Sequence, residues 1–280
     1  MKHSVSIFSI LFMIVICLGP VEIKEIPASN MAQKVQTLYV TPPSNIKNSS
    51  CPIDMVEIDG DYCKQTDELC LYWITIDGEK TDIMTDRCGE FRTPVHCMVT
   101  LIHKHFCIDK YEFPNRKGDV PKDWMSFYDA EKELKLVDKR VCTQSEWAFA
   151  AMGPNMHPYP YGDGFHRNHM CNIDRHLSEV GLTGAQVMKV SDPTSEIAQK
   201  IRSQLVPSGS MPYCHSDFGV YDMVGNIDEW VRNENGKPYI SALMSGHQYG
   251  VRNRSTASTI AHGPNFYWYE TGARGCKDIN

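Results

Sequence analysis

The chain has 280 residues, of which 42% are hydrophobic and 22% are charged. These values are those of an ordinary globular protein, so they exclude a wholly disordered chain and leave room for one large domain with a small appendage. The net charge of −6 and the lack of any basic run exclude the nucleic-acid binders, which carry a basic face.

The N-terminal segment has the form of an export signal. Lys2 precedes an apolar run that ends at Leu18 and is shorter than the ~20 residues needed to span a bilayer. We therefore expect residues 1–28 to be a signal peptide or an N-terminal anchor. The protein should then be periplasmic, secreted, or held outside a membrane through this segment alone. Residues 29–50 are polar, contain a Pro pair and predict a linker.

The cysteines predict disulfide bonds. Ten remain after the predicted signal, and none of their spacings gives the CxxC pairs of a zinc site. An even number of dispersed cysteines in an exported chain is typical of disulfides. They are Cys51, Cys63, Cys70, Cys88, Cys97, Cys107, Cys142, Cys171, Cys214 and Cys276.

We assign residues 51–104 to a cysteine-rich N-terminal section. Runs such as "MVEIDGDYC" and "LYWITIDG" alternate as strands do. The section holds five of the ten cysteines. Because five is odd, at least one of them should pair with the later part of the chain if all are bridged.

Residues 105–280 form the main predicted domain. "FCIDKYEF" alternates like a strand, and "MSFYDAEKELKLV" predicts a helix. The apolar residues at helical spacing in that segment are Phe127, Ala130, Leu134 and Val137.

Two further helices are predicted from their start signals. Thr143 and Glu146 form a capping box before an apolar helix. "SDPTSEIAQKIRSQL" predicts a helix capped by Ser191 or Asp192. Beyond Val206, Gly, Asn, Pro and aromatic residues predict loops crossed by short strands. The predicted class is an α+β fold that is irregular and rich in loops.

Several segments, in this order, resemble the formylglycine-generating (sulfatase-modifying factor) family. They are "CIDKYEFPN", "DAEKELKLVDKRVCTQSEWAFAAMG", "YPYGD", "CNID", "DFGVYDMVGNIDEW", "VRNRSTAS" and the final "GAR". The resemblance extends from about residue 105 to 276 and implies a C-type-lectin-like fold. The family includes copper-dependent oxidases, iron-dependent sulfoxide synthases, exported siderophore-maturing enzymes and members that only bind. It therefore implies the fold better than the reaction.

The resemblance also implies structural calcium. The family segment similar to "DMVGNIDEW" wraps a calcium ion, which prefers oxygen ligands. The implied ligands are the carboxylates of Asp222 and Glu229 and the carbonyls of Gly225 and Ile227. Asn172 and Ile173 match part of a second calcium site. The alternative is that Asp222 and Glu229 accept backbone N–H bonds without any ion.

Copper is not expected. The copper-dependent relatives need two thiolates five residues apart, because soft sulfur ligands hold Cu(I). The resemblance puts Ser245 and Gly250 at these positions, and no cysteine occurs between Cys214 and Cys276. The iron-dependent branch needs a separate three-histidine bundle, for which residues 29–98 are too short.

The candidate catalytic residues are His247 and His262. His247 falls between the two lost thiolate positions, and His262 lies in "AHGPNFYWYE". Both could instead be solvated or core histidines. The residues expected to line a pocket are Ser245, Gly250, Arg252, Arg254 and Trp268. The arginines could equally tie loops down, and the aromatic cluster could be core or could line a groove.

Two functions remain open at this point. The first is a non-catalytic exported binding or scaffold protein, whose ligand would be a peptide, a glycan or a small molecule. The second is an exported oxidoreductase of the formylglycine-generating or siderophore-maturation type, which modifies a peptide or metabolite through non-cysteine residues. Oxygen uptake in the presence of copper and a sulfatase-motif peptide would discriminate them.

Overall fold

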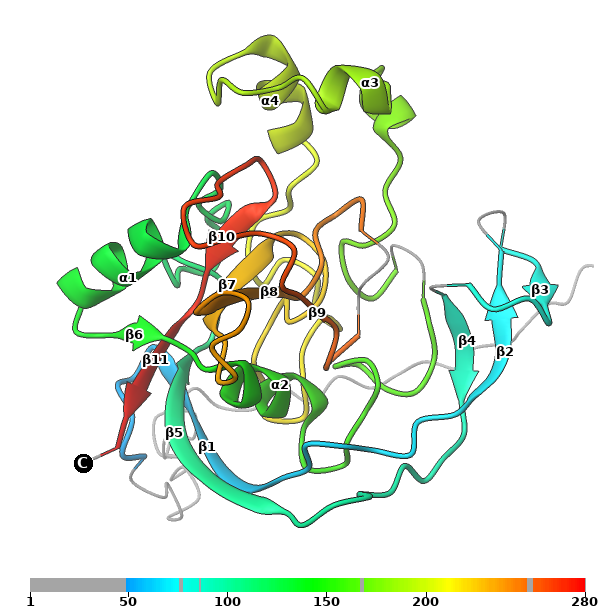
Figure 1. Ribbon diagram of the computed structural model, residues 1–280, viewed down its shortest axis with the longest axis vertical. Coiled ribbons are helices and arrows are strands. Elements are labelled where there is room, and N and C mark those ends of the chain that lie inside the picture. Colours follow the sequence, from blue (N-terminus) through cyan, green and yellow to red (C-terminus); the bar gives the residue numbers. More distant parts are fainter. Residues whose placement is uncertain (1–48, 76–77, 86, 167–168, 251–253, 280) are drawn as a thin grey trace, which may run out of the picture. The chain divides into compact units, whose positions relative to one another are not determined.

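The computed structural model describes residues 49–75, 78–85, 87–166, 169–250 and 254–279, as an α+β arrangement of short strands and few helices (Figure 1). The predicted signal and most of the predicted linker lie outside these residues. The predicted fold class is confirmed. The described strands form three sheets, and long loops connect them.

The first sheet joins the two ends of the described chain. Its order is β1 (Met55–Tyr62), β5 (Ile102–Asp109), β11 (Gly275–Asp278) and β6 (Arg140–Val141). β1 and β5 pair antiparallel over eight residues each. Residues of the cysteine-rich section therefore share a sheet with the C-terminal strand, and the described chain forms one compact unit from Asn48.

The second sheet carries the candidate site. Its order is β10 (Thr271–Ala273), β7 (Asp228–Arg232), β8 (Ser241–Met244) and β9 (Ser258–Thr259). The third sheet lies within the cysteine-rich section and has the order β3 (Lys80–Thr81), β2 (Cys70–Ile74) and β4 (Cys88–Phe91).

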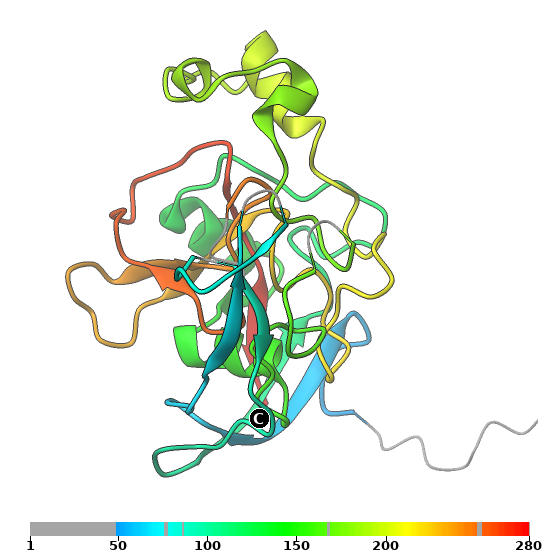
Figure 2. The same cartoon turned by 90° about the vertical axis from the view of Figure 1, so that its right-hand side faces the viewer.

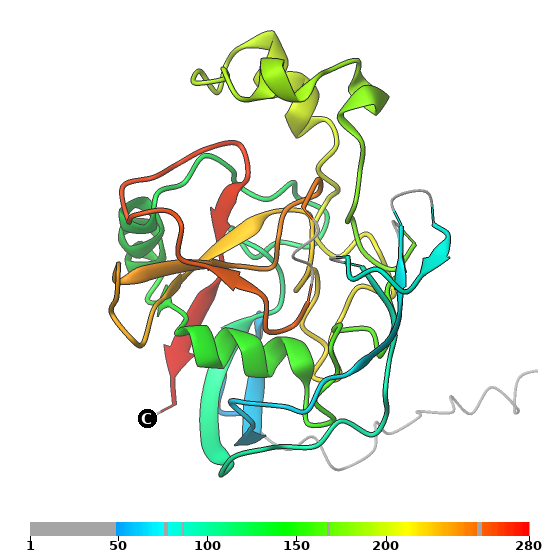
Figure 3. The same cartoon turned by 45° about the vertical axis from the view of Figure 1, so that its right-hand side comes forward.

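Helix α2 (Gln144–Met152) lies between the first two sheets (Figure 3). The predicted capping box of Thr143 and Glu146 is confirmed, with both reciprocal hydrogen bonds present. All residues from Glu146 to Met152 are buried, because they pack against β1 and β5 on one side and β7 and β8 on the other. The helix therefore holds the two sheets together through the main hydrophobic core.

Helix α1 (Phe127–Leu136) buries Phe127, Ala130 and Leu134, as the helical spacing predicts. Val137 differs from the prediction: it is the C-cap and is 52% exposed. The helix stops there, so the last apolar residue of the pattern does not reach the core.

The remaining helical segments are η2 (Leu177–Val180), a 3-10 turn, α3 (Gly184–Val187) and α4 (Glu196–Arg202). The predicted cap of α4 was wrong, because Ser195 and not Ser191 or Asp192 caps the Ala198 N–H. The Asp192 carboxylate instead accepts the N–H and hydroxyl of Thr194, which forms a turn before the helix.

All ten cysteines of the described chain form five disulfides, which confirms the prediction. The pairs are Cys51–Cys107, Cys63–Cys97, Cys70–Cys88, Cys142–Cys276 and Cys171–Cys214. The first of these is the predicted bond from the cysteine-rich section to the later chain. This pattern fits a periplasmic or extracellular protein. Among the described residues, no helix has the length and apolar character that a membrane crossing requires.

Candidate functional site

A helical segment covers one end of the second sheet. We call residues 177–205, which contain η2, α3 and α4, the helical cap; Figures 1 and 2 both show α3 and α4 on the far side of β10 from β1 and β5. Apolar residues of the cap pack against Tyr269, which is 6% exposed. The Trp268 indole N–H donates to the Val190 carbonyl over 2.9 Å, and the Tyr249 hydroxyl donates to Gln204. The cap is therefore fixed by aromatic residues from two loops of the sheet.

Three ligand-type side chains converge beneath this cap. They are Asp228, His247 and Glu270, and we call them the sheet-end cluster. The strand register brings them together. β10 runs parallel to β7 with Thr271 opposite Asp228, so Glu270 comes just before that pair. β8 runs antiparallel with Met244 opposite Glu229, so the chain leaves β8 toward His247 at the same end.

The sheet-end cluster is tightly spaced and largely shielded from solvent. His247 Nε2 lies 3.0 Å from Glu270 Oε2, and one ligand atom of each residue lies within 4.8 Å of the other two. Asp228 is fully buried, while the side chains of His247 and Glu270 are 15% and 11% exposed. The Gly246 N–H donates to Asp228 Oδ1 over 2.8 Å, which fixes the orientation of that carboxylate.

Aromatic rings surround the His247 imidazole. Tyr249 and Tyr269 meet it nearly edge-on, with ring centroids 6.0 and 5.9 Å away. Burial raises the pKa of Tyr249 to about 12. Burial, followed by the negative charge of Glu270, also raises the pKa of Tyr269. Both phenols are therefore neutral hydrogen-bonding groups near pH 7.

Ser245 and Gly250, which stand where the copper-dependent relatives have thiolates, lie in the loop that carries His247. Ser245 is fully buried, and its hydroxyl donates to the Gly225 carbonyl over 3.1 Å. Its φ of 88° lies in the left-handed region, which is uncommon for serine. A Cβ at Gly250 would lie 3.2 Å from the His247 backbone N and O, so a cysteine there would require that backbone to move.

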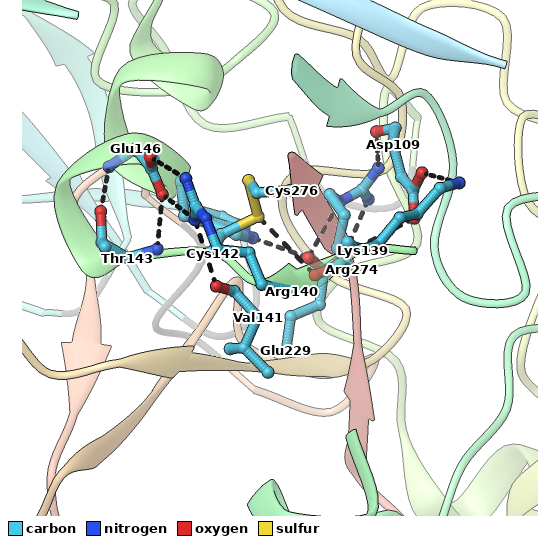
Figure 4. The surroundings of a disulfide bond; sticks show 12 residues. Asp109, Lys139, Arg140, Val141, Cys142, Thr143, Glu146, Glu229, Arg274 and Cys276 are labelled. Carbon is cyan, nitrogen blue, oxygen red and sulfur yellow. Dashed lines mark hydrogen bonds and ion pairs between the residues drawn. A yellow bond between two sulfur atoms is a disulfide. The ribbon is translucent and has the colours of Figure 1, made fainter. Parts of the chain in front are cut away.

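Glu229, an expected calcium ligand, forms a buried ion pair with Arg274 (Figure 4). Arg274 Nε lies 3.2 and 2.9 Å from its two oxygens, and Nη2 lies 2.8 Å from Oε1. The Trp147 indole N–H donates to Oε2 over 2.6 Å. These three N–H donors hold both oxygens of Glu229 in the interior, out of the about four acceptor positions that a carboxylate offers.

Two further buried carboxylates lie near that pair. Burial, with the negative charges of Asp222 and Glu229, raises the pKa of Glu112 well above its usual value. Burial raises the pKa of Asp222 to about 6, and the Gly209 N–H donates to its Oδ2 over 2.7 Å. Three buried acids therefore share the neighbourhood of Arg274, which favours either a proton on Glu112 or a nearby cation.

The Asn172–Ile173 segment, the expected second calcium site, lies against Gly225. A Cβ at Gly225 would come within 2.4 Å of the Asn172 carbonyl oxygen and of Ile173 Cγ2, so only glycine fits. The Asn172 side chain donates to Gln204 and Asn226. Its Oδ1 is buried with no hydrogen-bond partner. An unsatisfied amide oxygen is a suitable calcium ligand, so this atom fits a cation. The expected ligand Ile227 is also fully buried.

The other predicted site residues lie apart or serve the structure. Arg254 Nη1 lies 3.1 Å from Glu68 Oε2, which ties its loop to the cysteine-rich section. His262 stacks on Phe266 with centroids 3.8 Å apart. Trp268 belongs to the contact with the cap, and Arg252 lies outside the described residues.

The sequence reasoning missed Asp228 and Glu270. Asp228 follows the calcium-like loop in "NIDEW", and Glu270 ends the aromatic run "YWYE". Neither shows a spacing that links it to His247. Within the described ranges, these three residues are the only group of at least three His, Cys, Asp or Glu whose ligand atoms meet. The histidines that lie close together in the segment "HRNHMCNIDRH", His166, His169 and His176, do not form such a group.

The family of sulfatase-modifying factor enzyme 1-like domains matches residues 86–271, well over half of the chain. A comparison with curated proteins gave no match.

Among solved structures, the chain is similar to PvdO from Pseudomonas aeruginosa, with 18% identity, a TM-score of 0.48, and coverage of 82% of this chain and 96% of that chain. It is similar to CarF with 14% identity, a TM-score of 0.48, and coverage of 82% and 99%. It is also similar to Treponema denticola variable protein 1, with 11% identity, a TM-score of 0.39, and coverage of 81% and 100%. Similarity at this level says nothing about function.

Proposed function

Because the chain belongs to the sulfatase-modifying factor enzyme 1-like family, we propose that it is an exported binding or scaffold member that does not generate formylglycine. The observation that carries this proposal is that the described cysteines are all disulfide-bonded. All ten cysteines of the described chain lie in disulfides, so none of them offers a thiolate to copper.

The loop at the lost copper site supports the same proposal. The Ser245 hydroxyl donates a hydrogen bond to the Gly225 carbonyl and the residue is fully buried, so Ser245 cannot contact a ligand. Gly250 lies too close to the His247 backbone to accept a larger side chain without movement. Because the loop that contains Ser245 and Gly250 is a packed turn, a ligand would have to contact other residues.

Aromatic side chains beside the cap are the proposed contact surface for a peptide, glycan or small molecule. Tyr267 is 54% exposed, and its ring lies 6.2 Å from that of Trp124. Exposed aromatic rings bind sugars and peptides through their flat apolar faces. Export itself is part of the proposal and is supported by the signal-like N-terminus and by the five disulfides.

Oxygen consumption tests the proposal. The purified mature protein, supplied with Cu(I) and a sulfatase-motif peptide, should consume no oxygen above the rate of free copper, and the peptide cysteine should keep its mass. An authentic copper-dependent member of the family is the positive control. Copper-dependent oxygen uptake with loss of the peptide thiol would contradict the proposal.

A second candidate function is an exported oxidoreductase that uses other residues. The sheet-end cluster favours it, because a histidine paired with a carboxylate at 3.0 Å is an arrangement that can move protons. Turnover of a peptide or metabolite that is lost on replacing His247 would favour this candidate over binding alone.

Structural calcium is also part of the proposal, and calcium removal tests it. The buried carboxylates support an ion at the Asp222 loop, and the unsatisfied Asn172 Oδ1 supports a second ion at the Asn172–Ile173 segment. Calcium at about a hundredfold excess over its Kd should stabilise the fold by about 2.7 kcal/mol, and EGTA should reverse this. Differential scanning calorimetry would measure the change in Tm.

The variant Asp222→Asn keeps an acceptor for the Gly209 N–H and leaves the Glu229–Arg274 pair intact. It should lose most of the calcium-dependent rise in Tm. The control Asp192→Asn alters an exposed turn and should keep it. A wild-type Tm that does not respond to calcium or EGTA would refute the structural ion.

A further inference from the structure

The end of the second sheet gathers the side chains of a metal site that lies apart from both expected calcium segments. Asp228 begins β7, Glu270 precedes β10, and His247 follows β8. The strand pairs 271–228 and 244–229 bring these positions to one sheet end. The register fixes Asp228 and Glu270, and His247 reaches them from the loop after β8.

The spacing suits a single ion. Nitrogen and oxygen ligands lie about 2.0–2.2 Å from a zinc ion, so two ligand atoms on one ion are at most about 4.4 Å apart. One atom from each of the three residues lies within 4.8 Å of the others, and the His247–Glu270 distance is 3.0 Å. Shifts of about half an ångström would bring all three atoms onto one ion.

Burial strengthens the binding of a cation at this place. Asp228 and Glu270 are both buried, and the attraction between a carboxylate and a cation is stronger where water is excluded. The Gly246 N–H holds Asp228 Oδ1, which orients the group as outer-shell partners of metal ligands do. The cap and the rings of Tyr249 and Tyr269 shield the cluster.

The imidazole would have to change its proton position. The Tyr249 N–H approaches His247 Nδ1 over 3.4 Å, which leaves the ring proton on Nε2, facing Glu270. An ion would replace this proton at Nε2, and Nδ1 would then carry the hydrogen. Placing the hydrogen on Nδ1 would remove the long Tyr249 N–H contact, and a bond of that length contributes little.

We propose that Asp228, His247 and Glu270 bind one divalent transition-metal ion of the zinc or manganese class. One imidazole and two carboxylates suit such ions, whereas Cu(I) prefers sulfur and calcium prefers oxygen alone. The site is independent of the proposed binding function. The bound ion could contact an anionic group of a ligand or take part in a reaction. The test of this site does not use copper, so its outcome is distinct from that of the oxygen-consumption test.

Titration calorimetry with Zn²⁺ and Mn²⁺ on the EGTA-treated, tag-free mature protein, with calcium present in excess, tests the site. One Zn²⁺ should bind per chain, and more tightly than Mn²⁺, as the usual order of metal affinities requires. His247→Ala and Glu270→Gln should each weaken Zn²⁺ binding by at least about tenfold. Zn²⁺ should also raise the Tm of the wild type and should raise that of Glu270→Gln much less.

The control is His103→Ala. His103 is exposed and lies 3.4 and 3.3 Å from Asp59 and Asp61, so it is a surface group that could bind zinc adventitiously. This variant should bind Zn²⁺ as the wild type does. Glu270→Gln keeps the shape of the side chain, so it remains informative if His247→Ala fails to fold. A wild type that binds no Zn²⁺, or binding that survives Glu270→Gln and is lost in His103→Ala, would overturn the proposal.

Discussion

Replacing Arg274 by methionine should lower the free energy of unfolding by about 3–5 kcal/mol, because it leaves a buried charge without its partner. Arg274 is 1% exposed and donates to both Glu229 oxygens. It also donates to the carbonyls of Asp109 and Tyr221 over 3.0 and 2.8 Å. One guanidinium therefore connects the end of β5, the loop before β7 and β7 itself.

Denaturant unfolding with the disulfides intact would measure this loss. Arg92→Met is the control: Arg92 is 46% exposed, and its partner Asp67 is 21% exposed and also accepts the His96 N–H. This control variant should lower the free energy of unfolding by about 1 kcal/mol or less. The double variant Arg274→Met with Glu229→Gln should be more stable than Arg274→Met alone, because the amide carries no charge and can still accept the Trp147 N–H. A loss below about 1 kcal/mol for Arg274→Met would contradict this account.

Removing the Cys142–Cys276 disulfide by a double replacement with alanine should cost about 2–5 kcal/mol. The bond connects the segment before α2 to β11 across a separation of 134 residues, and both cysteines are fully buried (Figure 4). The disulfide keeps this long loop closed in the unfolded chain and so lowers the entropy of that state. Removing the bond raises this entropy, which favours unfolding.

The Cys70–Cys88 bond is the internal comparison, because it closes a separation of only 18 residues in the third sheet. Chain-entropy arguments give about 3 kcal/mol for a loop near that size and about 4.7 kcal/mol for one of a hundred residues. Calorimetry should therefore show a larger fall in stability for the long loop. Equal stability of the Cys142–Cys276 variant and the wild type would refute this expectation.

The local signals in the sequence were informative where one element decides the outcome. The Thr143–Glu146 capping box and the buried face of α1 follow from neighbours three or four residues apart. The odd number of cysteines before residue 98 required a bond to the later chain, and Cys51–Cys107 provides it. These predictions depend only on short-range geometry or on counting.

Short-range patterns in the sequence do not predict contacts between segments that are distant along the chain. The partner of Glu229 lies 45 residues later in the chain, so the sequence of the acidic loop does not reveal that Arg274 pairs with this carboxylate. The sheet-end cluster depends on the register of β7, β8 and β10, which spacing along the chain does not reveal. The N-cap residue of α4 differs from the prediction because the Asp192 carboxylate accepts a hydrogen bond within a turn before the helix.

We propose that this family member keeps the scaffold without a thiolate copper centre. X-ray absorption at the copper edge, on natively purified mature protein incubated with Cu(I) and then desalted, tests it most directly. We expect no retained copper with sulfur neighbours, since every described cysteine is in a disulfide. Stoichiometric Cu(I) held by two sulfur atoms would contradict the claim.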